Sequence, residues 1–311
     1  MWETNFLQSS IWADFQKHQK HQIIEKKTKN YSYLAIVERG KFSNRLYCPL
    51  GPLAKDIDSL DDALKDLKKQ ARRRHLDFVR IEPTLPHIKP SQLRDLGLRH
   101  ARRDVQPPHT VINDVSTDIQ TIEATLSQTA RRYARKCDKA GITYRVSYKP
   151  SDIDHFIKLI HEVSDRTGMV PHPDTYFQKI ATFLFPKKAA GLLLAELNKQ
   201  PIAAVIYYSD GKTMYYAHAA NSTEHRKLSP ATGLGLFALK FAHQSGCQIF
   251  DWFGTAPIDN DKNRRWKAWQ GFTRFKLSFG GERVNRAGTW ELPLKKGRYL
   301  IYRTLLALAR K

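Results

Sequence analysis

Three short strand patterns in succession, followed by one helix and one further strand, are the feature that most restricts how this chain can fold. The strand patterns are apolar runs separated by short polar turns, and they cover residues 191–197, 201–208 and 213–219. Turns of this kind join antiparallel neighbours in a sheet. Ser229 and Pro230 are typical of the N-cap and first position of a helix, which we expect over 231–244. The order predicts an α/β (α+β) domain with a mixed sheet flanked by helices.

The stretch 246–281 carries the residues with the most distinctive chemistry. It begins with an apolar strand that ends in the pattern Asp251-x-x-Gly. A charged loop rich in Asn, Asp and Arg follows over 255–265, and alternating bulky residues close the segment over 272–279. One cation, Lys276, lies among these bulky residues. A strand ending in Asp-x-x-Gly, then a basic loop, then a Phe-Lys pair is an unusual combination.

This combination resembles the FemABX family, the non-ribosomal peptidyl transferases that add amino acids to peptidoglycan precursors. The resemblance extends over nearly the whole chain. Its other marks are Leu-Gln-Ser followed by Trp near the N-terminus, and the run from Arg166 to Phe177, which is similar to an Arg-x-Gly…Tyr-Phe signature. The resemblance implies an aminoacyltransferase that uses aminoacyl-tRNA as co-substrate and needs no metal and no other cofactor.

The resemblance also implies two tandem GNAT-like acyltransferase domains. The meander, helix and strand of the second half match such a unit, and the first half shows a weaker version of it. Two prolines in 104–108 stiffen the chain and exclude a helix there, so we place the crossing between the domains at this point. The first domain is expected over 1–110 and is completed by 290–311, and the second over 111–289.

Two sites are implied as catalytic. Phe275 and Lys276 would lie in the active-site channel, where Lys276 supplies a positive donor to the oxyanion that develops on the ester carbonyl. Glu82 ends the buried strand pattern 76–83 and would position or deprotonate the attacking amine. A carboxylate at the end of a buried strand is more often a surface charge, and this structural interpretation stays open. The sequence has no Ser-His-Asp or Cys-His pattern and no clustered metal ligands.

The acceptor-binding residues follow from the same resemblance. Arg166 ends a predicted helix over 152–166, and its guanidinium would hold a phosphate or carboxylate of the acceptor. A cation at that position also stabilises the helix dipole, which is the structural alternative. Tyr215, Tyr216 and Lys17 are the other expected acceptor contacts. Because Tyr215 and Tyr216 point to opposite faces of their strand, only one of them can face a cleft.

A predicted helix over 126–141 combines an apolar stripe with a strongly basic face. Five cations lie within nine residues, and Asp138 is the only acid among them. Like charges at i and i+4 repel, so a face of this kind indicates an anionic partner, with a solvated surface as the simpler explanation. The net charge of +22 agrees with RNA or an anionic membrane as partner. The expected tRNA-binding residues are Arg131, Arg132, Arg135, Lys136, Lys139, Arg264 and Arg265.

The C-terminal segment 294–311 combines leucines and tyrosines with six Lys or Arg side chains. Such a basic amphipathic helix can lie on an anionic membrane, so peripheral contact with the inner membrane surface is one expectation. Packing of its apolar side onto the first domain is the other. No apolar run reaches the roughly 20 residues that span a bilayer, and the N-terminus has no signal-peptide pattern. Three scattered cysteines favour a cytoplasmic location, and we expect a monomer.

Two other function classes stay open. An acyl-CoA N-acyltransferase on the same fold needs a glycine-rich pyrophosphate cradle before the helix at 231–244, and the corresponding run 226–231 has its first glycine replaced. A non-catalytic RNA-binding protein would explain the charge but not the pair Phe275-Lys276. Within the first class the chain resembles the short form, which lacks a long helical hairpin. Both UDP-MurNAc-pentapeptide and lipid II stay open as the acceptor.

Overall fold

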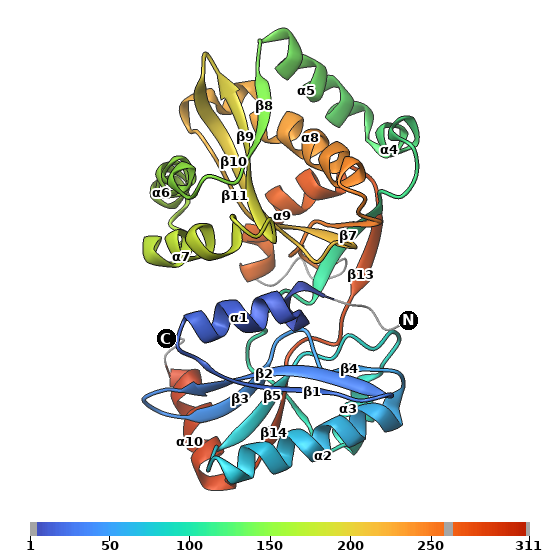
Figure 1. Cartoon of the computed structure of the whole chain (residues 1–311), viewed down its shortest axis with the longest axis vertical. Helices are drawn as coiled ribbons and strands as arrows, with labels where there is room; N and C mark the ends of the chain where they lie inside the picture. Colours follow the sequence, from blue (N-terminus) through green and yellow to red (C-terminus); the bar gives the residue numbers. More distant parts are fainter. Residues whose placement is uncertain (1–4, 258–263, 309–311) are drawn as a thin grey trace. The chain divides into compact units, whose positions relative to one another are not determined.

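The computed structural model describes residues 5–257 and 264–308 (Figure 1). The chain divides into two compact units. Unit 1 combines Met1–Pro108 with Asn285–Lys311, and unit 2 is His109–Val284. Because both ends of the chain belong to unit 1, unit 2 is an insertion between two parts of the same folded body.

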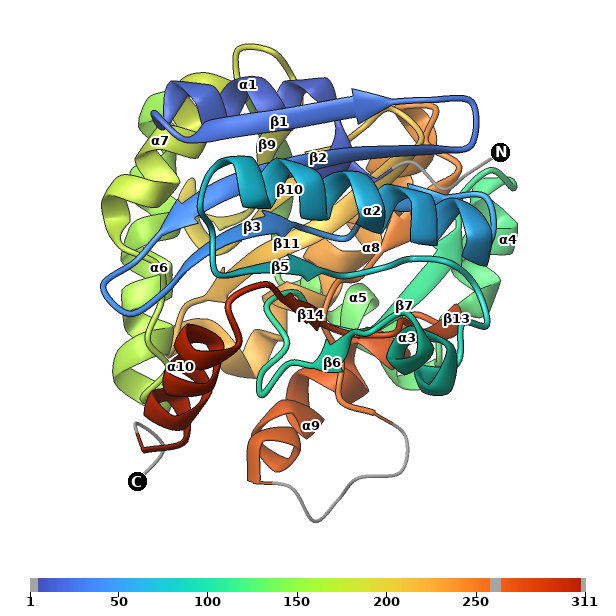
Figure 2. The same ribbon diagram turned by 90° about the horizontal axis from the view of Figure 1, so that it is seen from below.

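Unit 1 is built on a mixed sheet (Figure 2). Its strands are β1 (Gln22–Lys27), β2 (Tyr31–Arg39), β3 (Asn44–Cys48), β4 (Leu53–Ala54), β5 (Phe78–Ile81), β6 (Arg99–His100) and β14 (Trp290–Pro293). They follow the order β1-β2-β3-β5-β14-β6, with β4 paired to β2. β3 and β5 run parallel, and β14 lies antiparallel between β5 and β6. The C-terminal segment thus supplies an interior strand of the N-terminal sheet.

Helix α2 (Ile57–Arg73) supplies much of the core of unit 1. Leu60, Leu64 and Leu67 recur at helical spacing and are buried against the sheet. In Figure 2 this helix lies across the strands. The other helices of unit 1 are α1 (Ser10–His18), α3 (Pro90–Asp95) and α10 (Lys296–Leu308).

Helix α10 divides its apolar residues between two sides. Tyr299 and Tyr302 are buried and pack against Phe78 of β5. Leu300 and Ile301, in contrast, are exposed. The predicted packing of this segment on the first domain is confirmed for the two tyrosines only. Residues 310 and 311, which belong to the predicted basic segment, lie outside the described residues.

Unit 2 contains the second mixed sheet. Its strands are β7 (His109–Asp114), β8 (Thr143–Ser147), β9 (Ala190–Leu197), β10 (Gln200–Ser209), β11 (Thr213–Asn221), β12 (Ile249–Asp251) and β13 (Glu282–Asn285). They follow the order β13-β7-β12-β11-β10-β9-β8. β8 to β11 are joined antiparallel, and β11 and β12 are parallel. This is the predicted meander, with the crossover helix between β11 and β12.

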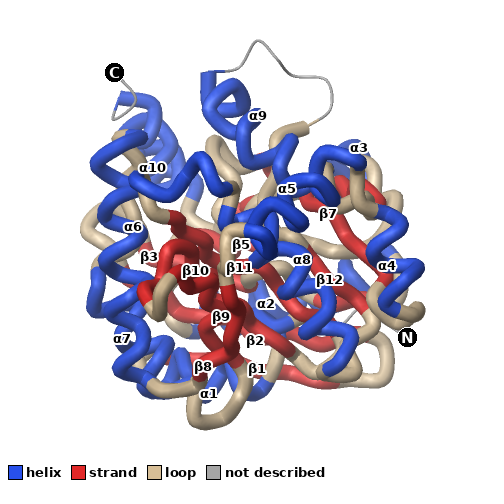
Figure 3. The backbone as a smooth tube through the Cα atoms, turned by 90° about the horizontal axis from the view of Figure 1, so that it is seen from above, coloured by secondary structure: helices blue, strands red, loops and turns tan. Residues whose placement is uncertain are grey.

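Helices cover both faces of this sheet (Figure 3). They are α4 (Ile119–Thr125), α5 (Gln128–Lys139), α6 (Ile153–Thr167), α7 (Asp174–Leu184), α8 (Pro230–Gln244) and α9 (Arg264–Leu277). α6 and α7 lie on one face, and α8 lies on the other with α5 beside it. α8 is buried along much of its length, because small residues such as Gly233 and Ala238 let it approach the strands closely.

The pairing of β11 with its two neighbouring strands is irregular. It pairs with β12 only from Thr213 to Tyr215, whereas its pairing with β10 continues to Asn221. On its other side, Tyr216 lies opposite Tyr207, but His218 lies opposite Ile206. The extra residue on β11 is a bulge, which shifts the alternation of side chains by one position. As a result Tyr216 faces the α8 side, whereas His218 contacts Phe177 of α7 on the opposite face.

One local expectation is wrong. The sequence predicts a loop through residue 265 and an alternating segment over 272–279, but Arg264–Leu277 is the helix α9. Trp266, Trp269 and Phe272 recur every three residues and contact one another in turn, which is a helical spacing. The bulky residues alternate in sequence only locally. Their wider period is that of a helix.

Three further observations limit the chemistry of the chain. Within residues 5–257 and 264–308, no helix is long and apolar enough to cross a membrane. The same residues contain no group of three or more His, Cys, Asp or Glu side chains that could hold a metal ion. Cys48, Cys137 and Cys247 are buried free thiols, and burial raises the pKa of each. None of the three is therefore an activated nucleophile.

Candidate active site

The turn after β12 holds a buried carboxylate and two residues with a left-handed backbone. Asp251, the last residue of β12, accepts hydrogen bonds from the hydroxyl of Thr110 and from the N–H of Phe253, the latter at 2.7 Å. Phe253 has φ +49° and Gly254 has φ +56°. A residue with a Cβ adopts this conformation at an energetic cost, so the contacts of the turn must hold Phe253 in place. The Asp-x-x-Gly pattern in the sequence marks this turn.

Lys276 donates to both carbonyl oxygens of the turn. Its ammonium contacts the oxygen of Phe253 and lies 2.8 Å from the oxygen of Gly254. An ammonium has three N–H donors, so these contacts leave one donor for a further partner. The last turn of α9 carries Lys276, and the rings of Tyr216 and Phe272 lie 6.0 and 5.3 Å from Nζ.

Burial lowers the pKa of Lys276 to about 7, although the negative charge of Asp251 acts in the opposite direction. The residue as a whole keeps some exposure, but its ammonium is surrounded by protein. The group therefore exists in both protonation states near neutral pH, unlike a surface lysine. Negative charge developing on a bound substrate would favour the protonated form. Such a group suits a donor to an oxyanion.

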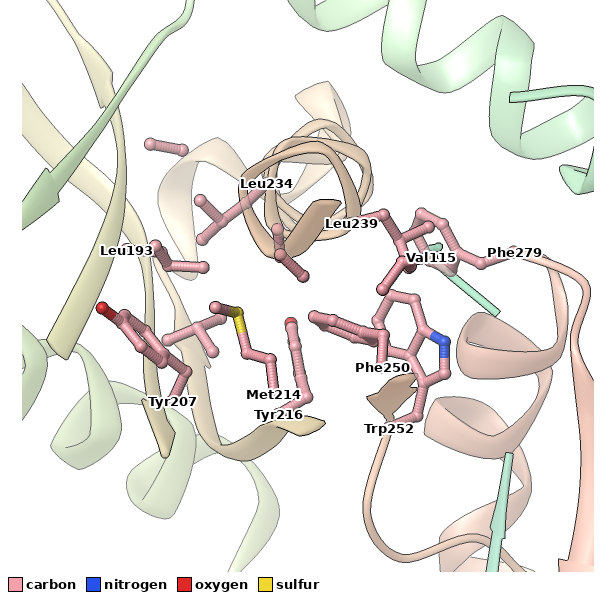
Figure 4. Packing of buried hydrophobic residues seen from close by; sticks show 14 of the residues in the cluster. Val115, Leu193, Tyr207, Met214, Tyr216, Leu234, Leu239, Phe250, Trp252 and Phe279 are labelled. Carbon is pink, nitrogen blue, oxygen red and sulfur yellow. The ribbon is translucent and has the colours of Figure 1, made fainter. Parts of the chain in front are cut away.

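Phe275 belongs to an aromatic group packed beneath this turn. Its ring centroid lies 5.1 Å from that of Phe279, 5.9 Å from Trp252 and 6.4 Å from Tyr216. Figure 4 shows Tyr216 and Trp252 next to each other in the core below α8. The indole N–H of Trp252 donates to the side-chain oxygen of Asn113 at 2.7 Å, which fixes the group to β7. The aromatic rings lower the local dielectric, and a single charged donor is worth most under that condition.

The two predicted tyrosines lie on opposite faces of β11, as expected, and both are buried. The ring of Tyr216 lies beside the ammonium of Lys276, with its centroid 6.0 Å from Nζ. Tyr215 donates to the carboxylate of Asp210 at 3.2 Å and so secures the turn between β10 and β11. Of the pair, Tyr216 is therefore the residue that the fold brings to the candidate site.

Arg166 joins the end of α6 to the end of β11. Its guanidinium lies 2.5 Å from the hydroxyl of Thr223 and 3.3 Å from the side-chain oxygen of Asn221, and donates to both. Gly168 follows with φ +70° and ends the helix. Because Arg166 has five N–H donors, the two contacts leave part of the guanidinium fork for an anion. The structure thus gives Arg166 a structural role without occupying it completely.

A cluster of aromatic rings in unit 2 was not predicted as a cluster, although two of its members, Tyr176 and Phe177, belong to the Arg-x-Gly…Tyr-Phe run. It consists of His172, Tyr176, Phe177, Tyr208 and His218, whose neighbouring centroids lie 4.4–6.1 Å apart. Burial lowers the pKa of His218 to about 3, and the nearby His172 acts in the same direction. His218 is therefore neutral at physiological pH. His218 joins the cluster because of the bulge in β11, which the sequence of the strand does not reveal.

The basic face of α5 is exposed. A surface hollow of about 580 Å³ lies along it and is lined by Gln128, Thr129, Arg131, Arg132 and Arg135. Lys136 donates to the backbone oxygen of Lys227 at 2.8 Å, so this cation is partly engaged. Arg264 and Arg265 begin α9, and their side chains lie outside the described part of the chain.

Glu82 and Lys17 belong to unit 1. Both carboxylate oxygens of Glu82 are occupied: four donors reach them, namely the Tyr47 hydroxyl at 2.8 Å, the Leu50 N–H at 3.1 Å, the Gln106 N–H at 2.8 Å and the Thr289 hydroxyl at 2.7 Å. Burial nevertheless raises the pKa of Glu82. The surface-charge interpretation is therefore wrong, and the saturated carboxylate weighs against a role in taking a proton from an amine.

Lys17 lies at the exposed end of α1. Its Nζ lies 3.0 Å from a carboxylate oxygen of Glu25 and 3.8 Å from one of Asp14, and the contact with Glu25 raises the pKa of Lys17. These are surface ion pairs, which an acceptor carboxylate could replace at little cost.

Three comparisons with known proteins give a matching domain model, a sequence relative and similar solved structures. Residues 125–268 match the model of the acetyltransferase (GNAT) domain. A lipid II:glycine glycyltransferase from Staphylococcus haemolyticus is 22% identical over 194 residues, a match that covers 62% of this chain and only 38% of that relative's length. The crystal structure of FemX superposes with a TM-score of 0.83 at 16% identity, over 96% of this chain and 94% of that one.

The chain is thus similar to FemX in fold and, over part of its sequence, to the lipid II:glycine glycyltransferase. A second solved structure, the C-terminal domain of a putative lysylphosphatidylglycerol synthetase from Agrobacterium fabrum, shares the fold at a TM-score of 0.64 and 13% identity, over 97% and 93% of the two chains. Among the described residues of unit 2, the longest helices are α6 and α8, with 15 residues each. The described part of unit 2 therefore contains no long helical hairpin.

Proposed function

We propose that this chain is an enzyme of the FemABX family that transfers an amino acid from aminoacyl-tRNA to an amine of the stem peptide of a peptidoglycan precursor. The observation that carries the proposal is the single remaining N–H donor of Lys276, held in a largely apolar site by the carbonyls of Phe253 and Gly254. The matched glycyltransferase, whose name gives lipid II as its substrate, supports this class of acceptor.

The proposed reaction needs neither a covalent bond between substrate and enzyme nor a metal. The acceptor amine attacks the carbonyl carbon of the ester, and the new C–N bond and an oxyanion form together. Lys276 donates its free N–H to this oxyanion. Collapse of the intermediate breaks the ester C–O bond, and the proton lost by the amine ends on the ribose hydroxyl of the tRNA.

An acyl-CoA donor is the main alternative, and the start of α8 speaks against it. A pyrophosphate cradle uses free backbone N–H groups at the first turn of that helix. Here Pro230 at the first position has no N–H, and the preceding Ser229 has φ +57°. The exposed cations of α5 instead favour a polyanionic donor.

One experiment separates these possibilities. The protein is incubated with a mixed aminoacyl-tRNA pool and with UDP-MurNAc-pentapeptide or lipid II, and the product is identified by mass spectrometry. We expect a mass increase of one or more amino acids that ribonuclease treatment of the donor pool abolishes. Activity that survives ribonuclease and requires an acyl-CoA would establish the alternative. Binding of tRNA without any transfer to either acceptor would point to a non-catalytic RNA-binding protein.

A further inference from the structure

Unit 1 carries an exposed apolar face surrounded by cations. Four of its large apolar side chains are strongly exposed: Leu300 at 65%, Ile301 at 59%, Leu308 at 61% and Phe42 at 55%. The first three lie on one side of α10, at positions i, i+1 and i+8, while Tyr299 of the same helix is buried. Helical residues this apolar are normally turned toward a core, so this side of α10 requires another explanation.

The segments around this face are joined at Asp77. Its backbone oxygen accepts from the N–H of Lys295, and its carboxylate lies 3.1 Å from Nε of Arg298 at the start of α10. The other carboxylate oxygen accepts from the N–H of Asn44 at 2.8 Å, at the end of the turn between β2 and β3. Phe42 belongs to that turn, and Figures 1 and 2 both show it beside α10.

Cations accompany the apolar residues. Lys41 lies in the same turn as Phe42, Lys296 begins α10, and Arg72 and Arg73 end α2, close to where Lys295 donates to the oxygen of His75. All four side chains are exposed, and no ion pair within the described part of the chain involves them. The basic-apolar face consists of Phe42, Leu300, Ile301 and Leu308 together with Lys41, Arg72, Arg73 and Lys296.

We propose that the basic-apolar face docks this protein on an anionic phospholipid surface. Aliphatic side chains on one side of a helix, flanked by Lys and Arg, enter the boundary between headgroups and acyl chains while the cations contact lipid phosphates. RNA would use the cations but leaves Leu300 and Ile301 without a partner. A second copy of the chain would bring like charges together, because a two-fold interface places each patch against itself. The proposal goes beyond the proposed function and does not depend on it.

Vesicle cosedimentation of the full chain tests the proposal without any transfer reaction. We expect the protein to sediment with vesicles of phosphatidylglycerol mixed equally with phosphatidylcholine, and to stay in the supernatant with phosphatidylcholine alone. Leu300→Ser combined with Ile301→Ser should abolish most of the binding. Lys41→Gln combined with Lys296→Gln should weaken it by on the order of 5-fold for each cation, and added salt should weaken it further.

Two matched variants serve as controls. Val170 is 90% exposed in unit 2, so Val170→Ser removes an exposed apolar side chain outside the face. Lys27 and Lys29 are exposed cations at the other end of β2 from Lys41, so Lys27→Gln with Lys29→Gln removes two charges from the same unit. Both controls should bind vesicles like the wild type, and thermal melting should show that every variant is folded.

Several results would overturn the proposal. Failure of the wild type to bind anionic vesicles would do so directly, and so would equal binding by the face variants and the controls. A dimer in light scattering that Leu300→Ser dissociates would mean that a second copy covers the face. Loss of tRNA binding in Lys41→Gln with Lys296→Gln, with vesicle binding unchanged, would assign the cations to RNA.

Discussion

The Nζ atom of Lys276 lies 2.8 Å from the carbonyl oxygen of Gly254, a residue that the turn holds at φ +56°. The lysine thereby neutralises two carbonyl dipoles and keeps one donor for substrate. Lys276 belongs to the last turn of α9. The turn after β12 is therefore closed by a side chain from a different element.

Replacement of Lys276 by methionine should reduce transfer by about 100- to 1,000-fold, the usual cost of one lost oxyanion donor. Methionine keeps most of the volume of the stem, so the variant should remain folded. Lys267→Met in the same helix is the control, because that lysine is exposed. A folded Lys276→Met enzyme with wild-type turnover would show that the ammonium only closes the turn.

The depressed pKa of Lys276 predicts a pH-dependent stability. In the unfolded chain the group keeps its ordinary pKa of 10.5, and in the folded protein it titrates at about 7. Between these values the unfolded state binds more protons, so the folded state gains stability as pH rises from 7 toward 10.5. Below both values the penalty for burying the charge is complete and constant.

Thermal melts at several pH values measure this effect. The Tm difference between wild type and Lys276→Met should move in favour of the wild type as the pH rises above 7, whereas the difference between wild type and Lys267→Met should stay constant. A constant gap for both variants would mean that Lys276 retains an ordinary pKa.

Arg166→Ala should raise the KM for the precursor more than it lowers kcat, because the proposed role of Arg166 is to bind the acceptor before the reaction. Lys158→Ala is the control, since Lys158 is an exposed cation on the same helix. If KM stays unchanged and only the Tm falls, the contacts with Asn221 and Thr223 are the whole function of Arg166.

Binding of tRNA should weaken steeply with salt, because each neutralised phosphate releases counterions. Changing Arg131, Arg132 and Arg135 together to Gln should flatten the log–log slope by roughly 0.7 to 0.9 for each lost contact. The control removes three exposed lysines from the same unit, at 179, 199 and 212. Equal slopes for the two triple variants would assign the effect to net charge instead of to α5.

Glu82→Gln should lower the stability of unit 1 by on the order of 2 kcal/mol or more, because an amide has one acceptor oxygen for four donors. Denaturant unfolding measures the loss, and Glu25→Gln, at an exposed carboxylate, is the control. A stable Glu82→Gln protein that has lost turnover would restore a catalytic role for this carboxylate.

The meander and its crossover helix could be predicted because the apolar residues of each element are spaced within a short window of sequence as a strand or a helix requires. The strands over 191–219 and the helix over 231–244 alternate or recur within a few residues of their neighbours. The pair Phe275-Lys276 was identified in another way, through the resemblance of the stretch 246–281 to the FemABX family. α9 was missed because its bulky residues also alternate over a short window, and only the longer period from Trp266 onward is decisive.

The surroundings of Glu82 and His218 could not be predicted from sequence. The donors to Glu82 come from residues as distant as Tyr47 and Thr289, and only the folded sheet brings them together. His218 reaches its face through a bulge, which depends on pairing with β10 and leaves no mark on the sequence of β11. In both cases tertiary contacts determine where a polar side chain points.

The position of β14 also affects how the protein is made. Residues 290–293 lie between β5 and β6 in the sheet, yet a ribosome synthesises them after all of unit 2. The sheet of unit 1 therefore cannot be completed until the whole of unit 2 has been synthesised. Until then the strand edges of β5 and β6 that face β14 have no partner, and open edges of this kind are what a chaperone would cover.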